Sequence, residues 1–132
     1  MREGDGLAVL LSVRAQSDVP DAIVVDLLPG GLELENPGLM DSTQQSELVI
    51  AGESISDRLS YRPVQFEEFR DDRYVAALNL NNGNSVELVY LVRAVSPGEF
   101  LVPPPQAEDM YRPQIRAIGK SPLTSITVES VQ

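Results

Sequence analysis

The sequence predicts an all-β fold, an antiparallel β-sandwich. Three observations support this fold class: apolar and polar residues alternate with a period of two along much of the chain, the alternating segments are short, and clusters of Pro, Gly and Asn separate them. About eight strands are expected. Because 132 residues are the size of one ordinary domain, residues 1–132 are expected to form a single domain.

Three extended segments are predicted before residue 36. From Leu7 to Ala15 every second residue is apolar, as in a strand with one face in the core. Residues 22–28 form a run rich in β-branched residues that ends at a Pro-Gly-Gly turn. Leu32 and Leu34 begin the third segment, which an Asn-Pro-Gly turn interrupts.

Residues 39–62 show no sustained period. Asp41 or Ser42 can cap a helix that runs to Leu48, but the Val-Ile-Ala-Gly sequence at 49–52 breaks it within about two turns. We expect a short helix or an irregular excursion in this segment.

After Pro63 the sequence predicts two hairpins. The first joins residues 64–69 to residues 74–80 through an acidic turn. In residues 74–80 the apolar even-numbered positions face one way. The second is predicted at residues 81–84, where Asn-Gly suits the positive φ values of a type I′ turn, and pairs residues 74–80 with the alternating strand 86–95.

The remaining elements are short. Residues 99–102 are extended, and the three prolines at 103–105 cannot donate to a central ladder, so this segment is expected at a sheet edge. Residues 107–113 are predicted to be a loop. An extended segment at 115–118, a turn and a last strand with Ile126 and Val128 complete the chain.

Composition restricts the function. The chain is 42% hydrophobic, which is enough to build a core, and its formal net charge of −10 disfavours nucleic acid and anionic membrane surfaces. It has no Cys and no His, and it has no phosphate-binding loop, nucleophile elbow or paired-His helix. We therefore expect no enzyme, metal, cofactor, nucleic-acid partner or direct membrane contact.

Clustered carboxylates have two interpretations. Glu67, Glu68, Asp71 and Asp72 contain hard oxygen ligands for calcium, but the spacing and central Gly of a calcium loop are missing, so a solvated hairpin tip with local ion pairs is favoured. The pairs Asp5 with Asp26 and Glu33 with Glu35 are interpreted as surface charge. A carboxylate-based hydrolase is the weakest of the functional hypotheses for this chain, because it rests on such acidic residues alone.

Three large side chains stand out. Tyr90 is expected in the core, with its hydroxyl bonded to backbone at a sheet corner. Met110 and Tyr111 stand beside Glu108, Asp109 and Arg112 before a proline. Either they anchor a partner surface or they fold back onto the domain, and their spacing leaves both possibilities open.

Five segments resemble the C-terminal macroglobulin-like domain of bacterial α2-macroglobulins over nearly the whole chain: residues 26–33 (DLLPGGLE), 69–73 (FRDDR), 90–94 (YLVRA), 97–104 (PGEFLVPP) and 107–113 (AEDMYRP). The resemblance implies an excised last domain, with Met1 as an expression start. Its parent is then a periplasmic protein, lipid-anchored to the inner membrane, that traps proteases. In that family a protease cuts a bait segment, and an internal thioester in another domain becomes exposed and couples to the protease.

The same resemblance implies a role for Met110 and Tyr111. They correspond to residues that pack on the thioester domain and shield its reactive bond before activation. The chain itself has no Cys and cannot supply the thioester, and its one lysine, Lys120, argues against the receptor-binding role of eukaryotic relatives. The alternative is an envelope interaction domain that binds a peptidoglycan synthase, with the edge at residues 103–105 as its docking strand.

Overall fold

The computed structural model of the chain describes residues 1–35, 49–50, 53–54, 64–121 and 123–130. Every regular element among these residues is a β-strand, and all pairs between named strands are antiparallel. In this described part of the chain there is no helix long and apolar enough to cross a membrane. The helix or excursion expected at 39–62 falls mostly outside the described residues, which include only the short pair β4 (Val49–Ile50) and β5 (Glu53–Ser54).

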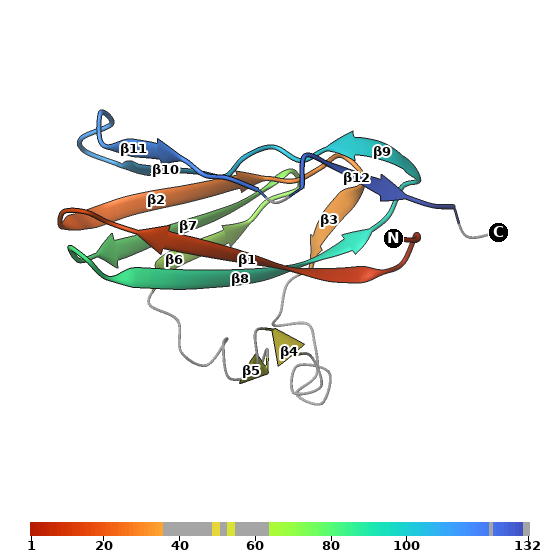
Figure 1. Cartoon of the computed structure of the whole chain (residues 1–132), viewed down its shortest axis with the longest axis horizontal. Coiled ribbons are helices and arrows are strands. Elements are labelled where there is room, and N and C mark those ends of the chain that lie inside the picture. The colour runs from red at the N-terminus through yellow and green to blue at the C-terminus, as the bar shows by residue number, and fades with distance from the viewer. Residues whose placement is uncertain (36–48, 51–52, 55–63, 122, 131–132) are drawn as a thin grey trace.

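Two main sheets form the layers of the molecule (Figure 1), which confirms the predicted β-sandwich. The three-stranded sheet has the order β1-β8-β3, and its strands are β1 (Gly6–Arg14), β8 (Ser85–Ala94) and β3 (Leu32–Glu35). The five-stranded sheet has the order β11-β10-β2-β7-β6, and its strands are β11 (Arg116–Ile118), β10 (Gln106–Asp109), β2 (Val19–Leu27), β7 (Arg73–Leu80) and β6 (Val64–Phe69). A separate pair joins β9 (Gly98–Leu101) to β12 (Ser125–Val128).

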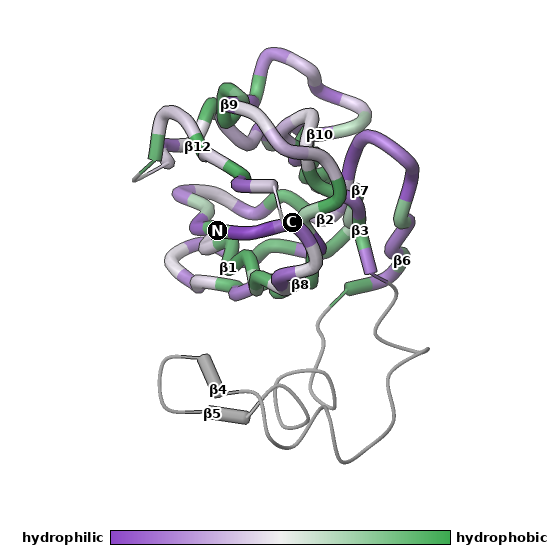
Figure 2. Tube along the Cα trace, turned by 90° about the vertical axis from the view of Figure 1, so that its right-hand side faces the viewer, coloured by the Kyte–Doolittle hydropathy of each residue, from purple (hydrophilic) through white to green (hydrophobic). Residues whose placement is uncertain are grey.

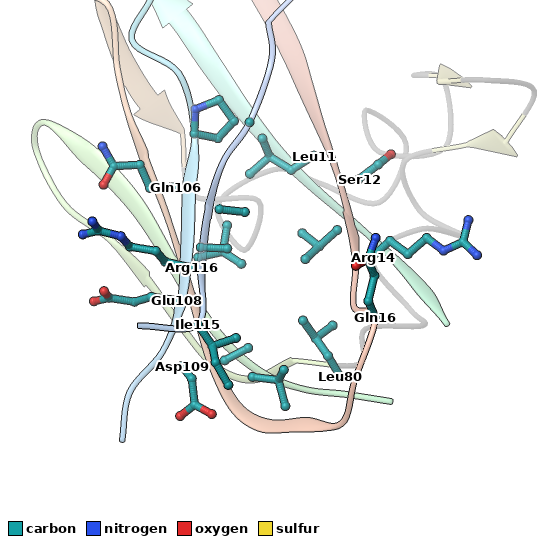
Figure 3. Close-up of a pocket in the computed structure, with 18 of the residues that line it drawn as sticks. Leu11, Ser12, Arg14, Gln16, Leu80, Gln106, Glu108, Asp109, Ile115 and Arg116 are labelled. Atoms are coloured by element: carbon teal, nitrogen blue, oxygen red, sulfur yellow. The ribbon is translucent and has the colours of Figure 1, made fainter. Parts of the chain in front are cut away.

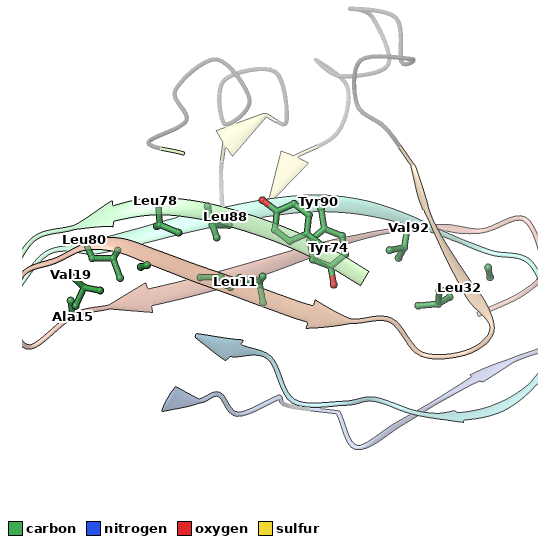
Figure 4. Packing of buried hydrophobic residues seen from close by; sticks show 14 of the residues in the cluster. Leu11, Ala15, Val19, Leu32, Tyr74, Leu78, Leu80, Leu88, Tyr90 and Val92 are labelled. Atoms are coloured by element: carbon green, nitrogen blue, oxygen red, sulfur yellow. The ribbon is translucent and has the colours of Figure 1, made fainter. Parts of the chain in front are cut away.

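The core lies between the two sheets. Hydrophobic stretches of the trace concentrate along β1, β2 and β8, whereas the connections are more hydrophilic (Figure 2). The four predicted inward positions of β7 are all buried: Tyr74, Ala76, Leu78 and Leu80. They pack with side chains of the opposite sheet, including Leu88, Tyr90 and Val92 (Figure 4). The period of two therefore predicted correctly which face of these strands points into the core, although Val75 and Ala77 on the other face of β7 are buried as well.

The predicted second hairpin is wrong, because β7 and β8 belong to different sheets. The turn itself exists: Asn84 N–H donates to Asn81 O at 3.1 Å, and Gly83 has a φ of 82°. However, this turn carries the chain from one layer to the other. The alternation of β7 and β8 indicates two buried faces, and these faces stack on each other across the core instead of lying side by side.

A second crossing accompanies this turn. The connection between β1 and β2 also joins the two sheets. Gly83 N–H donates to Ala15 O at 2.9 Å, and Asn82 N–H donates to Asp18 Oδ1 at 2.8 Å. Two connections that are far apart in the sequence therefore hold each other at one end of the sandwich.

Gly83→Ala should lower the free energy of unfolding by about 1 kcal/mol, because the positive φ of this residue disfavours a side chain even though the space around it is open. Urea unfolding of the variant tests this. Gly6→Ala is the matched control: it lies in β1, and the nearest atom that a Cβ at this position would meet is Val92 O, at 3.9 Å. Equal stability of Gly83→Ala and the wild type would contradict the prediction.

The predicted loop at 107–113 is corrected in its first part. Residues 106–109 form β10, which lies between β2 and β11. The segment lacks an apolar alternation of its own, and its strand conformation is fixed by pairing with β2 on one side and β11 on the other. The preceding prolines, at 103–105, belong to no strand among the described residues.

A buried polar contact corrects two further expectations. Asp26 is only 6% exposed and does not belong to the surface charge. The Tyr90 hydroxyl donates to Asp26 Oδ2 at 2.5 Å, so it bonds to a side chain of the opposite sheet and not to backbone. The Tyr90 ring stacks on Tyr74, with 4.6 Å between ring centroids. Burial raises the pKa of Asp26, and the Tyr90 hydrogen bond opposes that rise.

Phe100 of β9 packs on a group of glycines. Its ring lies against Gly30 and Gly31, which follow β2, and against Gly98 at the start of β9. A Cβ on Gly31 would lie 2.3 Å from Phe100 Cε2, so only glycine fits beneath the ring. The Pro-Gly-Gly and Pro-Gly-Glu-Phe motifs of the sequence therefore meet at one packing contact.

Candidate functional site

The candidate site is the connection between β10 and β11, which carries Met110 and Tyr111. It lies at the same end of the sandwich as the connection between β1 and β2 and the turn at 81–84 (Figure 1). Met110 is 42% exposed and Tyr111 is 79% exposed. Both side chains therefore project from the domain and do not fold back onto it, and their role as an anchor for a partner surface stays a prediction.

Asp109, the last residue of β10, organises the backbone of this connection. Its side chain is buried, and its Oδ1 accepts hydrogen bonds from the backbone N–H groups of Tyr111 at 2.9 Å and Arg112 at 3.2 Å. Such an Asx turn lets a carboxylate replace the backbone carbonyl that would otherwise close the turn. The backbone around Tyr111 is therefore fixed although the Tyr111 side chain is exposed.

Arg112 completes the arrangement. Its Nε donates to Asp109 Oδ2 at 2.9 Å, and its Nη2 lies 2.9 Å from the same oxygen. Nη2 also donates to Asp18 O, in the connection between β1 and β2, at 3.4 Å. The backbone N–H of Met110 donates to Asp21 O at 3.0 Å. These contacts attach the connection to two neighbouring segments.

The charge state of Asp109 follows from these donors. The backbone hydrogen bond from Tyr111, followed by the bonds from Arg112, lowers the pKa of Asp109 against the opposing effect of desolvation. A carboxylate with a lowered pKa in the folded state contributes stability above its ordinary pKa. That contribution is lost only as the pH falls through the lowered value, so Asp109 is ionised at neutral pH.

A groove adjoins the base of this connection. It has a volume of about 570 Å³ and lies between β1 and the β10–β11 pair (Figure 3). Its interior is mainly apolar and includes Leu11, Leu80 and Ile115, whereas Glu108 and Arg116 point away from it. It exists because the three-stranded sheet is narrower than the five-stranded sheet and leaves the inner face of β10 and β11 uncovered.

The acidic residues that the sequence singles out as clusters lie in other parts of the described structure. The turn between β6 and β7 has the predicted local ion pairs, Arg70 with Glu68 at 2.9 Å and Arg73 with Asp72 at 3.1 Å. Glu35 pairs with Arg93 in the three-stranded sheet. Within the described ranges, no three acidic side chains are grouped so that they would hold a metal ion.

The sequence identifies Met110 and Tyr111 but not the residues that hold them. In the sequence Asp109 and Arg112 are simply charged neighbours of the pair. An Asp followed three residues later by Arg, with a proline next, is compatible with an Asx turn closed by an ion pair, and this is the signal that could have found them.

Comparison with known proteins gives consistent matches. Residues 1–114 match the family described as "Bacterial Alpha-2-macroglobulin MG10 domain". The chain is 45% identical to the alpha-2-macroglobulin of Xylella fastidiosa (strain Temecula1) over 128 residues, which cover 97% of this chain and 8% of that protein. It thus spans a small fraction of the length of the curated relatives that it matches.

Two solved structures are also similar over 98% of the chain. Trypsin-activated alpha-2-macroglobulin from Escherichia coli matches with a TM-score of 0.82 and 44% identity, and the match covers 9% of that chain. Salmonella alpha-2-macroglobulin reacted with methylamine matches with a TM-score of 0.78 and 44% identity, and the match covers 8% of that chain.

Proposed function

Because the chain belongs to the bacterial alpha-2-macroglobulin MG10 domain family, we propose that it is a noncatalytic domain of a protease trap, and that it shields the trap's thioester. In this proposal the domain packs on the thioester domain of the same parent chain. It releases that surface when a protease cuts the bait segment. The relative from Escherichia coli that was activated by trypsin supports the protease as the trigger.

The observation that carries this proposal is the exposed pair Met110 and Tyr111. A thioester is lost when water or an amine reaches its carbonyl carbon. A thioether and an aromatic ring that cover this carbon exclude both reagents and add no nucleophile of their own. The pair is small enough to separate again, as a cap that must be released requires.

The fixed backbone suits the same task. Met110 and Tyr111 project from a connection that Asp109, Arg112 and Asp21 hold in place. A cap whose conformation exists before docking loses less conformational entropy when it docks than a flexible one. The projecting pair is therefore ready to bind without reorganisation.

The double variant Met110→Ala, Tyr111→Ala in the full-length parent should speed loss of the thioester in the absence of protease. We expect a rise of roughly tenfold, equivalent to about 1.4 kcal/mol of lost protection. Methylamine incorporation and release of the free thiol measure the rate. The Salmonella relative reacted with methylamine supports the choice of this amine as the probe.

Leu101→Ala is the matched control for this experiment. Leu101 is 79% exposed, as Tyr111 is, but it lies in β9, away from the β10–β11 connection. The control should leave the rate of thioester loss unchanged. An unchanged rate in the double variant would reject the assignment of the cap.

We further propose that the parent is a lipid-anchored periplasmic protein of the inner membrane, which fractionation of cells that express it would test. The alternative partner, a peptidoglycan synthase, is predicted from an edge at residues 103–105. Those residues belong to no strand in the described part of the chain, so they offer no ladder for strand addition. Binding to a synthase stays a prediction without a structural argument of its own.

A further inference from the structure

Two large apolar side chains that project into water need something to hold them there. Burial of Met110 and Tyr111 against the domain would remove apolar surface from water, so projection has a cost unless the backbone prevents that collapse. Both of their backbone N–H groups are bonded: that of Met110 to Asp21 O at 3.0 Å and that of Tyr111 to Asp109 Oδ1 at 2.9 Å. One of these two acceptors is a side chain.

We propose that Asp109 and Arg112 are positioning residues that hold Met110 and Tyr111 in the orientation required for shielding. This inference rests on the proposed function. Neither residue needs to touch the thioester. Asp109 is 2% exposed and faces inward, so it acts through the backbone of the residues that follow it.

The geometry requires a carboxylate at position 109. Oδ1 accepts the two backbone N–H groups, and Oδ2 accepts the guanidinium of Arg112. An asparagine at this position can still accept the two backbone N–H groups through its carbonyl oxygen. Its amide group would then place N–H donors against the N–H donors of Arg112, and the side chain would lose half of its contacts.

Arg112 connects this unit to the rest of the fold. Besides Asp109, it reaches Asp18 O, and the Asp18 carboxylate accepts the N–H of Asn82. Hydrogen bonds therefore link the Met110–Tyr111 connection through Arg112 to two of the connections between the sheets, the one between β1 and β2 and the one between β7 and β8. A lysine could replace the charge but not the simultaneous contacts to Asp109 and Asp18.

Other charges close to the unit provide controls. Glu108 and Arg116 face each other in the register of β10 and β11, and both point away from the groove beside Asp109. Glu108→Gln removes one negative charge, as Asp109→Asn does, from the neighbouring position of the same strand. It leaves the Asx turn intact.

The experiment uses the full-length parent with Asp109→Asn, Arg112→Lys and Glu108→Gln, each in the wild-type background and together with Met110→Ala and Tyr111→Ala. Thioester loss to methylamine is measured together with hydrogen exchange at the amides of residues 111 and 112. We expect Asp109→Asn and Arg112→Lys to speed thioester loss roughly fivefold and to speed exchange at these amides, with no change for Glu108→Gln.

A double-mutant comparison separates positioning from general destabilisation. If Asp109 acts through the shield, Asp109→Asn adds nothing to the rate once Met110 and Tyr111 are alanine. A further increase in that background would overturn the inference, as would a wild-type rate in Asp109→Asn when the double alanine variant is fast. If the Met110→Ala, Tyr111→Ala variant itself has the wild-type rate, the proposed function fails. Unchanged hydrogen exchange at the amides of residues 111 and 112 in Asp109→Asn would separately refute the positioning role.

Discussion

Tyr90→Phe is expected to lower the free energy of unfolding by about 3 kcal/mol at pH 7. The substitution keeps the ring, and with it the stack on Tyr74 at 4.6 Å, and removes only the hydroxyl. Asp26 then remains buried between the sheets without the donor it has now. A buried carboxyl group that loses its partner has a larger effect on stability than the lost hydrogen bond alone, because its polar atoms are then unsatisfied away from water. Urea unfolding measures the change.

Asp26→Asn is the control for this prediction, because an amide oxygen can still accept from the Tyr90 hydroxyl. We expect it to change stability by less than about 1 kcal/mol at pH 7. Comparable losses in Tyr90→Phe and Asp26→Asn would show that the loss in Tyr90→Phe does not come from leaving Asp26 without a donor.

The pH dependence has a definite sign. Since burial raises the pKa of Asp26, the folded state binds this proton more tightly than the unfolded state. The resulting stabilisation is fully present below the ordinary pKa of the carboxyl and is lost as the pH rises through the raised value. The stability of the wild type relative to Asp26→Asn should therefore increase as the pH falls, and the loss in Tyr90→Phe should become smaller.

Gly31→Ala is the second substitution with a large expected effect. The new Cβ would lie 2.3 Å from Cε2, 2.7 Å from Cδ2 and 2.9 Å from Cζ of Phe100, so the ring must move from its place beside Gly30 and Gly98. We expect a loss of about 3 kcal/mol in the free energy of unfolding, at the upper end for an overpacked site. Thermal or urea unfolding measures it.

A double-mutant cycle with Phe100→Ala identifies the cause of that loss. Removing the ring removes the clash, so Gly31→Ala in the Phe100→Ala background should cost under about 1 kcal/mol. Full additivity of the two changes would show that the backbone at Gly31, and not its contact with the ring, sets the requirement for glycine.

The fold class and most strands follow from the sequence because burial has a period of two. That period shows which side of a strand points into the core, as at Tyr74 and Leu78, but it does not show which strand lies beside it. The turn at 81–84 therefore reads as a hairpin in the sequence, although its strands lie in different layers. For the same reason β10, which depends on its neighbours for its conformation, has the sequence pattern of a loop.

The sequence predicts only part of the candidate site. Met110 and Tyr111 are unusual residue types for a solvated connection, so composition identifies them. The role of Asp26 depends on a contact with a residue far away in the sequence, Tyr90. Asp109 acts through hydrogen bonds from its near neighbours Tyr111 and Arg112, which the residue types alone do not specify. Because the apolar residues in the run at 22–28 are nearly continuous, the sequence does not show that Asp26 points inward.

The pairing of β1 with β8 has a consequence for how the domain folds during its synthesis. Gly6 is opposite Arg93 and Arg14 is opposite Ser85, and the strands from β2 to β7 are synthesised between the two partners. A nascent chain that has emerged from the ribosome only as far as β7 has no partner for β1, because β8 is the only strand that pairs with it in the described sheets. Folding must then wait for β8. Because pairing of β1 with β8 closes a long loop, we expect this pairing to be a slow, late step that takes roughly milliseconds to seconds.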